Sequence, residues 1–161
     1  MTEEQRAEVN ALFNAEVGFT KVIKTLKDAQ KPIIGHNPQY DLGFLYEKFI
    51  APMPETFLDF CREYRKNFPV TYDTKIIYYQ LKSDQGSLRT MLNEVYDKVR
   101  KDTKYSNNLT ISFDEAADNQ FANYESGLKL HDAGFDAYIT GYVFAMITKR
   151  QEIENLLNSC K

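Results

Sequence analysis

The sequence of 161 residues has few of the features that mark secreted, membrane-bound or strongly basic proteins. Its two cysteines, Cys61 and Cys160, provide neither a disulfide framework nor the spacing of a zinc site. No apolar run approaches the length of a membrane-spanning helix, and the acidic, polar beginning is unlike a signal peptide. The net charge of −3 excludes a generally basic surface for nucleic acid. We therefore expect an intracellular protein of the nucleus, the cytoplasm or both, with no membrane partner.

The composition indicates a folded domain. Hydrophobic residues make up 43% of the chain and aromatic residues 14%, which argues against disorder and allows a sizeable core. The sequence contains no internal repeat and no low-complexity stretch. We expect residues 1–161 to form a single domain.

Apolar spacing predicts helices separated by short strands. A helical pattern runs to about residue 29, with Gly18 dividing two helices, and residues 33–35 are typical of a short buried strand. A strand is expected over residues 70–75, a helix capped by Ser87 and including Met91, and an edge strand near 109–113. A last helix begins near Phe135 and runs past Ile147. Short strands that alternate with helices favour an α/β fold.

The expected helices each have an apolar face. The inward residues would be Leu42, Leu45, Tyr46 and Phe49 in one helix, Phe57, Phe60, Cys61 and Tyr64 in the next, and Phe135, Tyr138, Ile139, Tyr142, Val143, Met146 and Ile147 in the last.

Two parts of the sequence pair a histidine with an aspartate five positions later. These pairs are His36 with Asp41 and His131 with Asp136, and each aspartate lies at the beginning of an apolar helical pattern. This is typical of half of a two-metal phosphodiesterase site, in which carboxylates hold divalent ions and a histidine deprotonates the attacking water. The other half is missing: no aspartate is followed two residues later by glutamate, although a metal pair needs about four carboxylates.

Each of these residues also has a simpler interpretation. Asp41 alone suits a helix N-cap or a buried ion pair, and Asp136 alone suits a first helical turn, where the helix dipole favours an acid. Because Asp41 shares a helical face with Leu45, we expect its carboxylate to point inward, where a metal is one candidate partner. The combination of His131 and Asp136 favours a site, since Gly134 allows a tight turn between them.

Further polar residues lie near these motifs. Asp73 and Thr74 end an expected strand, where their side chains most simply hydrogen-bond to the backbone, whereas Lys75 could face a phosphate. Asn37 is most simply a turn residue with an additional role open. We interpret His36 as structural, because one general base suffices.

These motifs resemble those of the poly(A)-specific ribonucleases, a branch of the CAF-type deadenylases. This branch belongs to the exonucleases that use three aspartates, one glutamate and a histidine. The similarity runs from about residue 8 to residue 150, in the same order and with similar gaps. It rests on Val17-Gly18-Phe19, on Ile34-Gly35-His36-Asn37 with Asp41, on Phe68-Pro69 followed by Asp73-Thr74-Lys75, and on residues 130–141, the most specific stretch.

The resemblance implies an RNase-H-like fold and Mg²⁺-dependent removal of adenylates from the 3′ ends of single-stranded RNA. It assigns Asp41 as the third metal-binding acid, Asp136 as the fourth, and His131 as the general base. Asn37 and Lys75 correspond to positions that touch the RNA backbone.

The resemblance also implies that the sequence is the second, C-terminal half of a nuclease domain. In the family, the first two acids lie on an earlier strand, and a small RNA-binding domain comes before the part seen here. We therefore expect a partial RNase-H-like fold that lacks the first strands and is inactive alone. An open sheet edge or apolar face would receive the missing N-terminal half or a dimer partner.

Two other interpretations stay open. The first is a non-catalytic RNA-binding or scaffold protein on the same fold, which the missing acids favour. The second is an unrelated α/β domain in which these acids only cap helices, which the ordered series of motifs disfavours.

Overall fold

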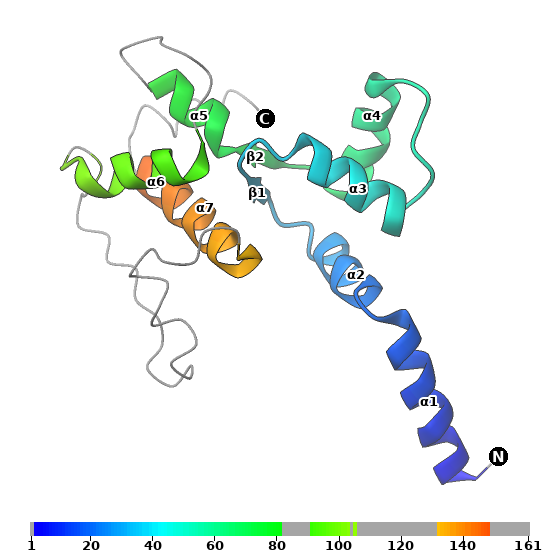
Figure 1. Cartoon of the computed structure of the whole chain (residues 1–161). Coiled ribbons are helices and arrows are strands. Elements are labelled where there is room, and N and C mark those ends of the chain that lie inside the picture. The colour runs from blue at the N-terminus through cyan, green and yellow to red at the C-terminus, as the bar shows by residue number, and fades with distance from the viewer. Residues whose placement is uncertain (1, 82–90, 104, 106–131, 149–161) are drawn as a thin grey trace. The chain divides into compact units, whose positions relative to one another are not determined.

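The computed structural model describes residues 2–81, 91–103, 105 and 132–148. Within these ranges it describes only the backbone of residues 10–16. Figure 1 shows the elements in chain order: α1 (Glu3–Val17), α2 (Thr20–Ala29), β1 (Ile33–Gly35), α3 (Gln39–Phe49), α4 (Phe57–Asn67), β2 (Thr71–Asp73), α5 (Thr74–Leu81), α6 (Leu92–Lys101) and α7 (Ala133–Ile147). The chain divides into two compact units, the first comprising Met1–Ile33 and Gln39–Thr71, and the second Ile34–Pro38 and Tyr72–Lys161.

Local interactions explain where helices of the first unit begin and end. Thr2 and Gln5 form a capping box at the start of α1, and Thr56 Oγ1 accepts the Asp59 N–H (3.2 Å) at the start of α4. Gly18, at a φ of 47°, ends α1 in a conformation that other residues adopt with strain. The predicted division of this region into two helices at Gly18 is confirmed.

The core of the first unit is largely aromatic. Its buried members are Ile23, Tyr46, Phe60, Tyr64 and Phe68. Tyr46 and Phe60 meet edge to face, with ring centroids 5.5 Å apart and an interplanar angle of 89°. Burial raises the pKa of the Tyr64 phenol, while its hydrogen bond with Thr71 (3.2 Å) opposes that rise.

The expected inward face of α3 is confirmed around Tyr46. Phe57, expected inward, is 69% exposed because it opens α4 at the rim of a groove.

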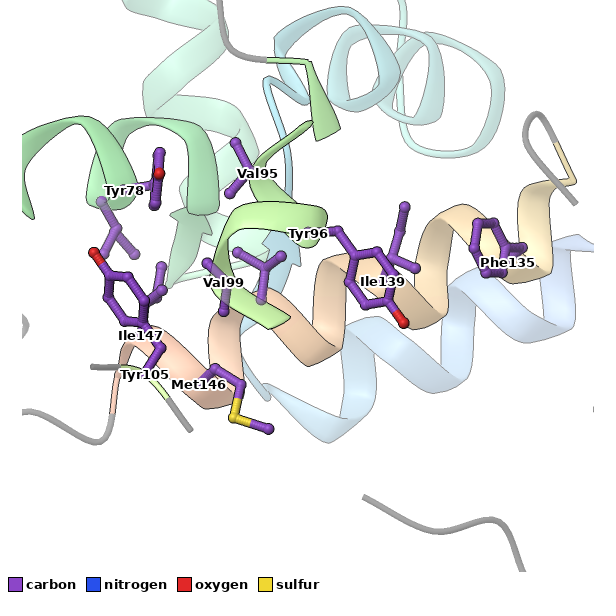
Figure 2. Close-up of a cluster of buried hydrophobic side chains, with 11 residues drawn as sticks. Tyr78, Val95, Tyr96, Val99, Tyr105, Phe135, Ile139, Met146 and Ile147 are labelled. Atoms are coloured by element: carbon purple, nitrogen blue, oxygen red, sulfur yellow. The ribbon is translucent and has the colours of Figure 1, made fainter. Parts of the chain in front are cut away.

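The core of the second unit is built around α7. Its fully or nearly buried residues are Phe135, Ile139, Val143, Met146 and Ile147. Figure 2 shows Phe135, Ile139, Met146 and Ile147 beside Val95, Tyr96 and Val99 of α6, all of which are buried. Tyr72 stacks on Phe144 with ring centroids 5.5 Å apart. The expected inward face of the last helix is confirmed, with Tyr138 and Tyr142 half-buried at its edge.

The strands β1 and β2 form a two-stranded sheet. The Ile33 N–H donates to the Val70 carbonyl (3.0 Å), and two residues later the Gly35 carbonyl accepts the Thr74 hydroxyl (3.1 Å). Partners thus advance in the same direction on both strands, so the pairing is parallel. The described chain is mostly helical with a small parallel sheet. The strand at Ile33–Gly35 is where it was expected, but it is not buried, since Ile34 is 37% exposed.

Three expectations about the elements are wrong. The strand expected over residues 70–75 ends at Asp73, because Asp73 accepts the Lys75 N–H and starts α5. The helix that includes Met91 begins only after it, because the Met91 backbone is extended. Gly134 lies within α7 rather than in a turn, because Asp132 Oδ1 accepts the Phe135 N–H (3.0 Å) and starts the helix earlier. Ser87 and the expected edge strand at 109–113 lie outside the described residues.

Within the described ranges, no helix has both the length and the apolar character needed to cross a membrane.

Two substitutions on α7 should change stability in opposite directions. Ile139 is 1% exposed, so Ile139→Ala should lower the free energy of unfolding by about 2–5 kcal/mol through a cavity in the α6–α7 core. A methyl group at Gly141 would meet no atom within 4 Å, so Gly141→Ala should raise stability by about 0.5–1 kcal/mol. Urea denaturation followed by circular dichroism measures both. A loss on Gly141→Ala would show that this face of α7 is covered.

Candidate functional site

The turns that follow β1 and β2 are joined by one aspartate. Asp73 Oδ1 accepts the backbone N–H of Asn37 and the backbone N–H of Lys75, each at 2.9 Å. The second bond caps α5, and the first crosses to the other turn. One carboxylate oxygen therefore fixes the backbone of both turns. We call this region, the turn at Asn37 and the turn at Asp73 and Lys75, the junction.

A second set of bonds links the same two turns through a buried hydroxyl. Thr74 is fully buried, and its Oγ1 donates to the Gly35 carbonyl (3.1 Å) while lying 2.9 Å from His36 Nδ1. A hydroxyl has a single proton to donate, so His36 Nδ1 donates to Thr74. These contacts confirm the prediction that Asp73, Thr74 and His36 serve the local structure.

The turn after β1 depends on Gly35 and Asn37. A Cβ on Gly35 would lie 2.5 Å from the Pro38 Cβ, so only glycine fits at this position. Asn37 has a φ of 57°, in the left-handed region that asparagine tolerates better than most residues. Its predicted role as a turn residue is confirmed.

The junction brings together the two residues to which the resemblance assigns contact with RNA. Lys75 Nζ donates to Asn37 Oδ1 at 3.4 Å, although the two residues are 38 positions apart in the sequence. Asn37 is exposed and Lys75 is half-buried, so both side chains can be reached from solvent. An ammonium beside an amide suits a phosphate or sugar oxygen.

The two candidate metal-binding aspartates lie in first helical turns. Asp41, in α3, is exposed, so the expectation that it points inward is wrong, although Leu42 and Leu45 of the same helix are half-buried. Asp136, in α7, is half-buried, and its backbone carbonyl accepts the Thr140 hydroxyl (2.7 Å). In the described part of the chain, neither carboxylate has a hydrogen bond or an ion pair.

A complete metal centre is not assembled by the residues that the structure describes. Among them, no group of three or more histidine, cysteine, aspartate or glutamate side chains could hold an ion. Asp41 belongs to the first unit and Asp136 to the second, and His131 lies outside the described residues. Their roles as metal ligands and general base stay predictions.

The first unit contains a groove of about 430 Å³ that was not predicted from the sequence, between α3 and the segment that leads into α4. Tyr40, Phe44 and Phe57 line it and are each more than 60% exposed. Glu47 and Glu55 also line it, without any lysine or arginine among the described lining residues. Two carboxylates would repel a phosphate backbone, so the junction suits RNA better than the groove. The signal in the sequence was the spacing of Tyr40 and Phe44, one turn apart and outside the inward face of α3.

Comparison with known proteins supplies the family. The model of the CAF1 family ribonucleases matches residues 1–144. Over 154 residues the chain is 29% identical to the poly(A)-specific ribonuclease PARN of Arabidopsis thaliana, covering 89% of this chain and 22% of that protein. It is 31% identical to the pre-piRNA 3′-exonuclease trimmer of Bombyx mori and 32% identical to the poly(A)-specific ribonuclease PNLDC1 of Homo sapiens, covering 86% of this chain and 26% of each protein.

These matches confirm the resemblance seen in the sequence, and they set its extent. The chain spans about a quarter or less of the length of these relatives. The matched family has an RNase-H-like nuclease fold. The chain therefore belongs to the CAF1 family of ribonucleases.

Proposed function

We propose that this chain forms the second half of the catalytic domain of a Mg²⁺-dependent 3′-to-5′ exoribonuclease that removes poly(A) tails. Family membership supports the reaction class, and the names of the relatives support an RNA 3′ end as substrate. The observation that carries the proposal is the contact between Asn37 and Lys75. This contact places an amide and a cation together at the junction. The amide belongs to Asn37, which is four residues before the candidate metal ligand Asp41 in the sequence.

The candidate ligands suit Mg²⁺ in kind but not in number. Carboxylate oxygens are the donors that Mg²⁺ prefers, and Asp41 and Asp136 would supply them. A pair of divalent ions needs about four carboxylates, and the described residues gather no group of three metal-binding side chains. We therefore assign no catalytic step to an ion bound by this chain alone.

The chain's own residues would act on the RNA and on water. Lys75 and Asn37 would hold the backbone of the terminal nucleotides by charge and hydrogen bonding. In the assembled site His131 would accept a proton from the water that attacks the terminal phosphodiester. The bond from phosphorus to the 3′ oxygen would break, and that oxygen would take a proton to become the new 3′ hydroxyl, with a 5′-monophosphate as the released product. The remaining acids would come from the N-terminal half of the nuclease domain or from a dimer partner, and the isolated chain would be inactive.

A second candidate is a non-catalytic RNA-binding or scaffold protein on the same fold. The absence of an Asp-x-Glu pair from this sequence favours this candidate. The enzyme and a non-catalytic RNA-binding protein would both bind RNA at the junction, and they differ in whether Asp41 and Asp136 act in hydrolysis once the other acids are present.

The isolated chain should leave RNA intact. Incubated with a 5′-labelled oligoadenylate and Mg²⁺, it should produce no shortened products on a denaturing gel, because two acids cannot balance two divalent ions. Asp41→Asn is the control. Shortening that Asp41→Asn abolishes would contradict the inactivity but support the role of Asp41. Shortening that persists in Asp41→Asn would contradict the assignment of Asp41.

Binding to RNA should depend on Lys75 through its charge. Lys75→Gln should weaken binding of a labelled oligoadenylate and reduce the slope of log affinity against log salt by about 0.7, the effect of one lost phosphate contact. Lys101→Gln removes a charge that is 78% exposed on α6 and should leave the slope unchanged. Fluorescence anisotropy in EDTA measures both without cleavage. Equal slopes for the two variants would place the RNA elsewhere.

A further inference from the structure

Among the residues that the structure describes, Asp73 makes its two hydrogen bonds through the same oxygen. Oδ1 accepts the Lys75 N–H within its own turn and the Asn37 N–H of a turn 36 residues away. Asp73 is half-buried and is the last residue of β2. A carboxylate that accepts two backbone donors is held firmly, because charge-assisted bonds of this kind are stronger than neutral ones.

The backbone of Asn37 needs such support. A φ of 57° is unfavourable for a residue with a side chain, and it persists where neighbouring groups fix it. The bond from the Asn37 N–H to Asp73 fixes this conformation directly. The same backbone conformation determines the position of the Asn37 side chain, whose Oδ1 accepts a hydrogen bond from Lys75 Nζ.

We propose that Asp73 is a positioning residue that sets Asn37 and Lys75 as a pair for the phosphate backbone of single-stranded RNA. This inference rests on the proposed function, because it assumes that RNA binds at the junction. Asp73 acts through the two backbone N–H groups that it accepts, not by touching RNA.

The negative charge of Asp73 and its hydrogen bonds should affect RNA affinity in opposite directions. A carboxylate close to a bound phosphate repels it, so the charge itself opposes binding while the hydrogen bonds favour binding. Asparagine keeps an oxygen that can accept both N–H groups and is an equally good helix cap. Removal of the charge alone and removal of the hydrogen bonds should therefore have different effects.

The test compares two substitutions in the 161-residue chain with a labelled oligoadenylate in EDTA, by fluorescence anisotropy. Asp73→Ala should weaken binding about three- to tenfold, as expected for a lost hydrogen bond that orients a contact. Asp73→Asn should bind as tightly as the original chain or more tightly. An affinity for Asp73→Asn as low as that for Asp73→Ala would overturn the proposal, because the charge rather than the hydrogen bonds would then matter.

Two controls separate positioning from a general loss of structure. Thr56→Ala removes the equivalent N-cap of α4 and should lower stability by a similar amount without changing RNA affinity. Asn37→Gly with Lys75→Gln removes both RNA-contacting groups while glycine keeps the left-handed backbone. In that double variant, adding Asp73→Ala should cause no further loss of affinity. A full additional loss would mean that Asp73 acts on RNA directly.

Amide hydrogen exchange, followed by NMR, tests the positioning without RNA. In Asp73→Ala the amides of Asn37 and Lys75 should exchange faster, while that of Ile33, bonded to Val70, should not change. Unchanged exchange at Asn37 would overturn the proposal whatever the RNA result. If the original chain does not bind the oligoadenylate, the proposed function fails. If it binds and Asp73→Ala binds equally well, only the role of Asp73 fails.

Discussion

The candidate site depends on the parallel pairing of β1 and β2. Each strand has only three residues, so the ladder alone contributes few hydrogen bonds. The pairing is nevertheless the feature that brings residue 37 and residue 75 together, because parallel strands end at the same edge of a sheet. Ligand-binding side chains in α/β proteins gather at that edge for the same reason.

Side chains supplement this short ladder. The Thr74 hydroxyl donates to Gly35, the last residue of β1, and the Asp73 carboxylate accepts from Asn37 in the turn after β1. Thr74 can do so while fully buried because its oxygen has partners on both sides, Gly35 and His36. A buried hydroxyl without a hydrogen-bond partner would lower the stability of the fold by about 1–3 kcal/mol. The polar residues at the junction therefore stabilise the fold and shape the site together.

Sequence reasoning predicted the helices better than it predicted the positions of the acids. The inward faces of α3 and α7 followed from apolar spacing, because packing demands that period. The division at Gly18 followed from the conformational freedom of glycine. The exposure of Asp41 did not follow, because residues on one helical face are not all covered by neighbouring elements. Local spacing does not reveal which of them are covered.

The junction was predicted only in part, for a similar reason. The motifs around Asn37 and Lys75 were recognised separately, and only the resemblance gave them a common role. Their contact depends on which strands pair, and three-residue strands carry too little pattern to specify a partner. The bond from the Asn37 N–H to Asp73 joins residues 36 positions apart and has no signature in the sequence.

Exposure to solvent explains how a candidate metal ligand can lie in the folded chain without a partner among the described residues. An exposed carboxylate such as Asp41 keeps its water and needs no protein partner, whereas a buried unpaired acid would cost several kcal/mol, on the order of the desolvation penalty for an ion. Under the proposed function, an acidic chain with a net charge of −3 must still hold a polyanion. One lysine beside the amide of Asn37 provides local attraction for the backbone. The remaining compensation would come from the divalent ions of the assembled site, so RNA binding and metal binding should strengthen each other there.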